Sequence, residues 1–148
     1  MLRTRVIPTL LIRNGDLVKG CQFKNHRYVG DPINVVKIFN EKEVDELVFL
    51  DISATSRGSI NYEIISDIAS EAFMPFAYGG GIATVTQIEK LFQIGVEKVI
   101  INSAAQQTPD LIKDAVKVAG SQSIVLSMDV KKTLWGSYEV YTHNATTR

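Results

Sequence analysis

Short apolar runs alternate along the chain with longer amphipathic stretches, at a regular interval. The amphipathic stretches carry hydrophobic residues three and four positions apart, as one face of a helix does. This alternation is typical of repeated strand–helix units that build a parallel sheet covered by helices. The pattern predicts an α/β fold with about four complete strand–helix units and a fifth strand.

The apolar runs define the predicted strands, which are residues 5–12, 47–52, 75–78, 98–101 and 123–130. Asn14-Gly15 follows the first strand and predicts a tight hairpin turn there. The segment 138–142 looks like the return arm of a second hairpin, which Trp135 is expected to pack against. Each hairpin therefore follows the strand that begins a new series of units.

Local start signals mark the predicted helices. Asp31 precedes Pro32, and a side-chain cap followed by proline at the first helical position favours a helix start. Asn61 is a plausible cap for the second helix, and residues 84–87 form a capping-box sequence for the third. Residues 108–110 are expected to cap the fourth.

The fifth unit loosely repeats the first, because residues 10–13 align with residues 128–131 and a hairpin follows each. A repeat after four units is typical of a (βα)8 TIM barrel with twofold internal symmetry. A complete barrel needs roughly 250 residues. We therefore predict one domain over residues 1–148, an incomplete barrel with a half-barrel at 1–120 and the start of a second at 121–148. Open sheet edges predict pairing with another copy or with a partner fragment.

The composition fits an ordinary globular protein, with 45% hydrophobic and 22% charged residues. Sixteen Lys and Arg balance sixteen Asp and Glu, so no net field attracts nucleic acid or an anionic membrane. A single cysteine, Cys21, excludes an internal disulfide, and the first residues do not resemble a signal peptide, so a cytoplasmic location is expected. His26 and His143 lack metal-ligand spacing, and no metal or cofactor is expected.

In parallel α/β barrels the active site lies at the carboxyl ends of the strands. The candidate residues at that end are Leu11, Asp51, Gly79, Gly80, Gly81, Asn102, Ser103 and Asp129. Successive glycines before a helix expose backbone N–H groups that suit a phosphate, and an amide and a hydroxyl after the fourth strand can add to the same anion. The structural alternative is a plain flexible turn.

Asp51 and Asp129 both end apolar strands, where a carboxylate is costly to bury unless it is solvated, paired or used in chemistry. Each is a candidate acid or base, and each has the alternative role of anchoring loop backbone. Lys19, on the first hairpin, is placed to reach a phosphate over the barrel mouth or to remain solvated.

Arg5, Glu46 and Lys98 each stand near the amino end of a predicted strand. Their side chains are expected to form ion pairs around the barrel floor. Charges at that end usually stabilise the barrel. The alternative role is a gate.

Six short motifs occur together in the chain: Val6-Ile7-Pro8, Val18-Lys19-Gly20, Gly30-Asp31-Pro32, residues 45–52, Gly79-Gly80-Gly81-Ile82 and Ile101-Asn102. This combination resembles the cyclase subunit of imidazole glycerol phosphate synthase. The resemblance implies a glutaminase partner on the barrel floor, whose ammonia crosses the barrel to a bisphosphorylated ribosyl substrate. It implies no cofactor.

The resemblance also implies roles for individual residues. Arg5, Glu46 and Lys98 would be gate residues, Lys19 and Asp51 substrate-binding residues, and Gly80, Gly81, Asn102 and Ser103 a phosphate site. Asp129 matches one of the two catalytic aspartates of the family. The position of the other is occupied here by Leu11.

Leucine neither donates nor accepts a proton, and a general acid or base typically contributes about 10²- to 10⁴-fold in rate. The primary hypothesis is therefore an ammonia-handling subunit with altered cyclase chemistry. A related group of barrels, linked to amidation of surface-polysaccharide sugars, resembles this chain and delivers ammonia to a separate amidotransferase. Two further hypotheses are a non-catalytic scaffold and a fragment of a normal-length barrel.

Overall fold

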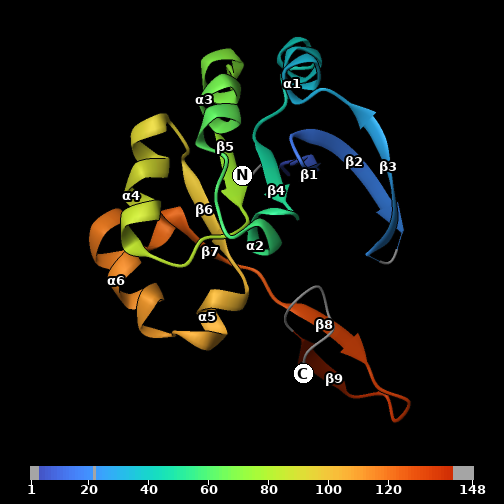
Figure 1. Cartoon of the computed structure of the whole chain (residues 1–148), viewed down its shortest axis with the longest axis vertical. Coiled ribbons are helices and arrows are strands. Elements are labelled where there is room, and N and C mark those ends of the chain that lie inside the picture. Colours follow the sequence, from blue (N-terminus) through green and yellow to red (C-terminus); the bar gives the residue numbers. More distant parts are fainter. Residues whose placement is uncertain (1–3, 22, 142–148) are drawn as a thin grey trace.

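The structure is a computed structural model that describes residues 4–21 and 23–141. Its main feature is a curved seven-stranded sheet of order β3-β2-β1-β4-β5-β6-β7, with a separate β8-β9 hairpin (Figure 1). The strands are β1 (Thr9–Arg13), β2 (Asp16–Cys21), β3 (Lys24–Gly30), β4 (Leu47–Asp51), β5 (Phe76–Gly79), β6 (Lys98–Ile101), β7 (Ile124–Leu126), β8 (Asp129–Lys132) and β9 (Tyr138–Tyr141). The helices are α1 (Pro32–Glu41), α2 (Ala54–Arg57), α3 (Tyr62–Glu71), α4 (Val85–Ile94), α5 (Ser103–Gln107) and α6 (Asp110–Ala119), with a short 3-10 turn η1 (Ser121–Ser123).

Five strands, β1, β4, β5, β6 and β7, run parallel to one another. This confirms the predicted α/β class with its parallel sheet. The hairpin predicted at Asn14-Gly15 is confirmed, because β2 pairs antiparallel with β1 directly after this turn, and β3 extends the sheet further as another antiparallel strand. Within the described residues, the sheet therefore ends at β3 on one side and at β7 on the other.

The local signals place three of the helix starts correctly. The Asp31 carboxylate accepts a hydrogen bond from the Asn34 N–H, and Asn61 caps α3 in the same way. Thr84 and Gln87 form the complete capping box of α4. Helix α6 also begins where it was expected, at Asp110, but the expected cap is wrong because no side chain accepts a hydrogen bond there.

The core lies between one face of the sheet and the helices. Phe49, Tyr78 and Val99 stand side by side on β4, β5 and β6, and all three are buried. The neighbours Leu50 and Ile100 point to the opposite, concave face and stay partly exposed. Helices α1, α3, α4 and α6 contact one another in that order and cover the convex face (Figure 1).

Two predicted strands are corrected by the structure. The first is expected from residue 5 but begins at Thr9. The fifth is expected to be continuous over 123–130, but β7 ends at Leu126 and β8 begins at Asp129. The Ser127 N–H still donates to the Ile101 carbonyl at 2.9 Å, after which the chain leaves the sheet and enters the hairpin. Ser127 is the one polar residue between the two strands, and a single serine does not distinguish a break from a continuous strand.

Two short helices, α2 and α5, occupy segments without an amphipathic pattern. Gly58 ends α2 with a φ of 72°, in the left-handed region that favours glycine. In the part of the chain that is described, none of the helices has the length and hydrophobicity to cross a membrane.

Candidate functional site

The carboxyl ends of the parallel strands form one rim of the sheet, and the candidate residues follow these ends. Gly80 and Gly81 come directly after β5, and Asn102 comes directly after its neighbour β6. Asp51 ends β4, and Asp129 opens β8 just past the end of β7. The topology therefore brings the predicted rim residues to one edge.

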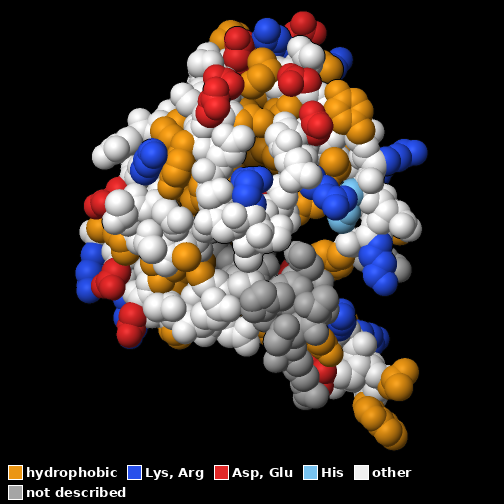
Figure 2. Space-filling model, viewed as in Figure 1, with side chains coloured by type: hydrophobic (Ala, Val, Ile, Leu, Met, Phe, Trp, Pro, Cys, Tyr) orange, Lys and Arg blue, Asp and Glu red, His pale blue; other side chains and the backbone are white. Residues whose placement is uncertain are grey.

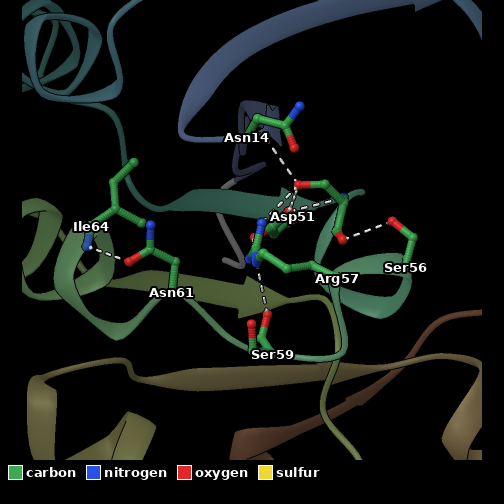
Figure 3. Close-up of polar contacts among 8 residues, drawn as sticks. Asn14, Asp51, Ser56, Arg57, Ser59, Asn61 and Ile64 are labelled. Atoms are coloured by element: carbon green, nitrogen blue, oxygen red, sulfur yellow. Dashed lines mark hydrogen bonds and ion pairs between the residues drawn. The ribbon is translucent and has the colours of Figure 1, made fainter.

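Asp51 is buried and its carboxylate is engaged within the protein (Figure 3). Its Oδ1 accepts hydrogen bonds from the Ser53 N–H at 2.9 Å and from the Ser53 hydroxyl at 2.7 Å. Its Oδ2 forms an ion pair with Nη2 of Arg57 at 2.8 Å. Both carboxylate oxygens thus have partners on the β4–α2 segment, which matches the anchoring role considered for this residue.

Ser53 extends the network to the first hairpin. Its hydroxyl oxygen accepts hydrogen bonds from the Asn14 N–H at 3.0 Å and from Nη1 of Arg57 at 3.1 Å. Asn14 and Gly15 both have positive φ values, 54° and 97°, which is the backbone of a tight type I′ hairpin turn. Nε of Arg57 also donates to the Ser59 carbonyl at 3.2 Å. The network therefore links the β1–β2 turn, the β4–α2 segment and the loop that follows α2.

A recess of about 470 Å³ opens beside this network and is lined by Asn14, Arg57, Ser59, Ile60 and Asn61. All of its lining residues except Ile60 are polar. The recess therefore lies between the β1–β2 turn, which holds Asn14, and the segment that leads from Arg57 to the start of α3.

The glycine turn after β5 packs closely on the same segment. A Cβ on Gly80, which has a φ of 130°, would lie 2.4 Å from the Asp51 carbonyl oxygen. A Cβ on Gly81, with a φ of 68°, would lie 2.9 Å from the Ala54 Cβ. Both glycines are therefore required by backbone conformation and by close approach, whatever they bind. The turn is constrained by its neighbours, unlike the plain flexible turn considered from sequence.

Asn102 and Ser103 begin the α5 segment beside β6. Asn102 lines a smaller recess of about 180 Å³ together with Ser127, Met128 and Tyr141. This recess separates α5 from the start of the β8–β9 hairpin. Asp129 pairs in register with Tyr141 and is partly buried next to it.

Lys19 lies on β2, paired with Arg27 on β3, and its side chain is exposed. Leu11 lies on β1 beside Leu50 of β4, on the partly exposed concave face. His143 lies outside the described residues. Among those that are described, no group of His, Cys, Asp and Glu side chains could hold a metal ion.

The predicted ion pairs are present at the opposite end of the sheet. Glu46 is buried, and Nζ of Lys98 lies 2.6 Å from its Oε1 and 2.7 Å from its Oε2. Nη1 of Arg5 lies 3.7 Å from Oε2 of the same carboxylate, but the Arg5 side chain is 60% exposed. Lys98 is thus the main partner of the buried charge.

Tyr78 is a buried polar residue that hydrophobic patterning does not single out. The residue is 1% exposed, and its hydroxyl is the one buried side-chain polar atom of the described chain without a hydrogen-bond partner. Burial raises the pKa of its phenol, and the nearby Asp51 carboxylate raises that pKa further. The sequence pattern also does not identify Arg57 and Ser53 as partners of Asp51. An arginine six residues after an aspartate at a strand end is a signal that could indicate the ion pair.

The β8–β9 hairpin projects from the rim and carries hydrophobic side chains at its tip (Figure 2). Leu134 and Trp135 are almost fully exposed there. The expectation that Trp135 packs the hairpin is wrong, because the turn carries it away from both strands.

Comparison with known proteins gives consistent matches. The model of the family described as "Histidine biosynthesis protein" matches residues 5–148. The "Putative imidazole glycerol phosphate synthase subunit hisF2" of Pseudomonas aeruginosa is 52% identical over 147 residues, which cover 99% of this chain and 59% of that protein. The "Putative imidazole glycerol phosphate synthase subunit hisF3" of Vibrio vulnificus is 52% identical over 148 residues, which cover 99% of this chain and 57% of that protein.

The imidazole glycerol phosphate synthase subunit HisF of Petrotoga mobilis is 43% identical over 145 residues, which cover 97% of this chain and 58% of that protein. The chain therefore spans less than two thirds of the length of these relatives. The family match covers nearly all of its residues and agrees with the parallel α/β sheet. The chain belongs to the histidine biosynthesis protein family.

Proposed function

We propose that this chain forms the first part of a (βα)8 barrel that handles glutamine-derived ammonia, as a subunit of the imidazole glycerol phosphate synthase type. The observation that supports this best is the placement of Gly80, Gly81 and Asn102 directly after the neighbouring strands β5 and β6. Backbone N–H groups of a glycine turn and an adjacent amide suit a phosphate group. The names of the relatives support a phosphorylated ligand of this class.

The chemistry at the rim is proposed to differ from that of a standard cyclase. Leu11 lies in the middle of β1, two residues before the strand end where it was expected, and its side chain is on the concave face; Asp129 is the remaining candidate acid or base. With one proton-transfer group in place of two, the rate of cyclisation is expected to be lower by about 10²- to 10⁴-fold. A subunit that passes ammonia to a separate acceptor, such as an amidotransferase for surface-polysaccharide sugars, is the second candidate, and Leu11 is the residue that favours it.

The floor of the sheet is the proposed entry for ammonia and the proposed docking face for a glutaminase. The Glu46–Lys98 pair, with Arg5 at its edge, supports this role because the charges lie together at the amino ends of the strands. The remaining part of the barrel is proposed to add along β7, supplied by further strands or by a second copy.

Turnover of the bisphosphorylated ribosyl substrate with added ammonium salt tests the proposal. We expect specific binding of the substrate, with product formation at least about 100-fold slower than for a cyclase that carries both aspartates. Binding without turnover would support the ammonia-delivering role. A rate equal to that of a standard cyclase would contradict the altered chemistry, and absence of binding would favour a scaffold.

A further inference from the structure

The Arg57–Asp51–Ser53 network joins elements that are distant in sequence. Ser53 bonds the Asn14 N–H, which belongs to the β1–β2 turn, 39 positions away along the chain. The β1–β2 hairpin carries Lys19 on its second strand. The network therefore fixes one end of this hairpin to the β4–α2 segment.

The glycine turn is fixed against the same segment from the other side. Gly80 approaches the Asp51 carbonyl so closely that a methyl group there would lie 2.4 Å from the oxygen. Gly81 approaches Ala54 in the same way. A displacement of the segment that contains Asp51 and Ala54 is therefore transmitted to the turn proposed to bind phosphate.

Arg57 is the residue that holds this segment in place. Helix α2 has four residues, so its own hydrogen bonds stabilise it little. Arg57 donates to the Asp51 carboxylate, the Ser53 hydroxyl and the Ser59 carbonyl, and thereby ties together both ends of the segment. Its side chain is 32% exposed, so the hydrophobic core does not depend on it.

We propose that Arg57 is a positioning residue for the phosphate site: acting through Asp51 and Ser53, it sets the Gly80–Gly81 turn and the β1–β2 hairpin relative to each other. This inference rests on the proposed function for its ligand. In this arrangement Asp51 serves the ligand indirectly, since its oxygens are occupied by Ser53 and Arg57.

The test uses the full chain labelled with ¹⁵N and inorganic phosphate as the probe. Arg57→Ala and Asp51→Asn are compared with Lys37→Ala, which removes an exposed cation from α1. If Arg57 acts by position, Arg57→Ala and Asp51→Asn each weaken phosphate binding about tenfold or more, and the double variant is no worse than either single one. Lys37→Ala is expected to bind like the original chain.

A direct contact between Arg57 and the anion gives the opposite result for Asp51→Asn. Removing the carboxylate would free the positive charge and tighten phosphate binding, which would overturn the inference. Arg57→Lys separates charge from geometry, because lysine keeps the charge but cannot form the same fork of hydrogen bonds. Restoration of full affinity by lysine would also overturn it.

The unliganded spectra provide a readout that does not need phosphate binding. Arg57→Ala and Asp51→Asn should shift the amide signals of Asn14, Gly80 and Gly81, while core signals such as that of Val99 stay in place. If the original chain binds no phosphate but these shifts appear, the phosphate proposal fails and the positioning role stands. If the three amides do not move in folded Arg57→Ala, the positioning role fails.

Discussion

The side chains of Leu11 on β1 and Asp51 on β4 point to opposite faces of the sheet, although the two strands are adjacent and parallel. The register pairs Leu11 with Leu50 and Ile12 with Asp51, so a residue of the concave face lies next to one of the helix face. Asp51 is consequently buried in its network, whereas Leu11 lies on the open concave side. The two positions have separate surroundings, and a change at one is expected to leave the other undisturbed.

Leu11→Asp should therefore be tolerated and should add a proton-transfer group on the concave face, two residues before the end of β1. A carboxylate on the partly exposed concave face stays solvated, so the free energy of unfolding should fall by about 1–2 kcal/mol. Ammonium-dependent turnover should rise by at least about 10²-fold. Leu11→Asn is the control, since it has the same shape and cannot transfer the proton. Equal rates for the two variants would contradict a catalytic role for this position.

Lys98→Met should destabilise the protein strongly, because it leaves the buried Glu46 carboxylate without its main partner. The expected loss is about 3–5 kcal/mol. Arg5→Met removes an exposed charge 3.7 Å away and should cost less than about 1 kcal/mol. Urea unfolding measures both changes. The double variant Glu46→Leu with Lys98→Met should recover most of the stability, and failure to recover would mean that Lys98 acts by packing.

Gly80→Ala should disrupt the glycine turn. The added methyl group would lie 2.4 Å from the Asp51 carbonyl oxygen at a φ of 130°, and the expected loss of stability is more than about 2 kcal/mol. Gly15→Ala is the matched control, because Gly15 also has a positive φ but has open space around its Cβ position. It should cost about 1 kcal/mol. Equal losses would show that backbone conformation alone, without the close contact, sets the requirement for glycine.

Because the Tyr78 phenol is buried, we expect the folded protein to lose stability in alkali. Its pKa is raised in the folded protein, so the stabilisation is fully present below the unfolded pKa of about 10 and is lost as the pH rises above it. The slope expected from this one group is about 1.4 kcal/mol per pH unit. Tyr78→Phe should remove that contribution and, by deleting an unpaired buried hydroxyl, should raise stability at neutral pH by about 1–2 kcal/mol.

Denaturant unfolding at pH 7 and between pH 10 and 11 measures both effects in the original chain and in Tyr78→Phe. Tyr138→Phe is a suitable control because Tyr138 is exposed on β9. The expectation fails if Tyr78→Phe is less stable at neutral pH or keeps the full alkaline slope.

The features predicted correctly from sequence are those whose signals are local or shared by many residues. Asp31 and Thr84 cap helices through contacts three residues away, so the pattern predicts them directly. The Glu46–Lys98 pair follows once both residues are placed at strand starts. Parallel pairing then fixes which strand ends meet at the rim.

The features that were missed depend on geometry beyond the strand. The run 47–52 is almost uniformly apolar, so no alternation shows that Asp51 points toward the helices. Arg57 lies in a segment without periodicity, and its role appears only when α2 folds back over β4. The break between β7 and β8 arises because the chain leaves the ladder after Ser127, and neither Ser127 nor Met128 carries a turn signal such as glycine or proline.

The hairpin of β2 and β3 makes the two edges of the parallel sheet unequal, because it covers the β1 edge and leaves the β7 edge open among the described residues. From Leu11 onward the outer side of β1 is already hydrogen-bonded to β2, so an incoming strand finds only the start of β1 vacant there. At β7 no such arm intervenes among the described residues. For the proposed barrel, we therefore expect further strands to pair with β7 first and to reach the start of β1 last, next to the β2–β3 hairpin.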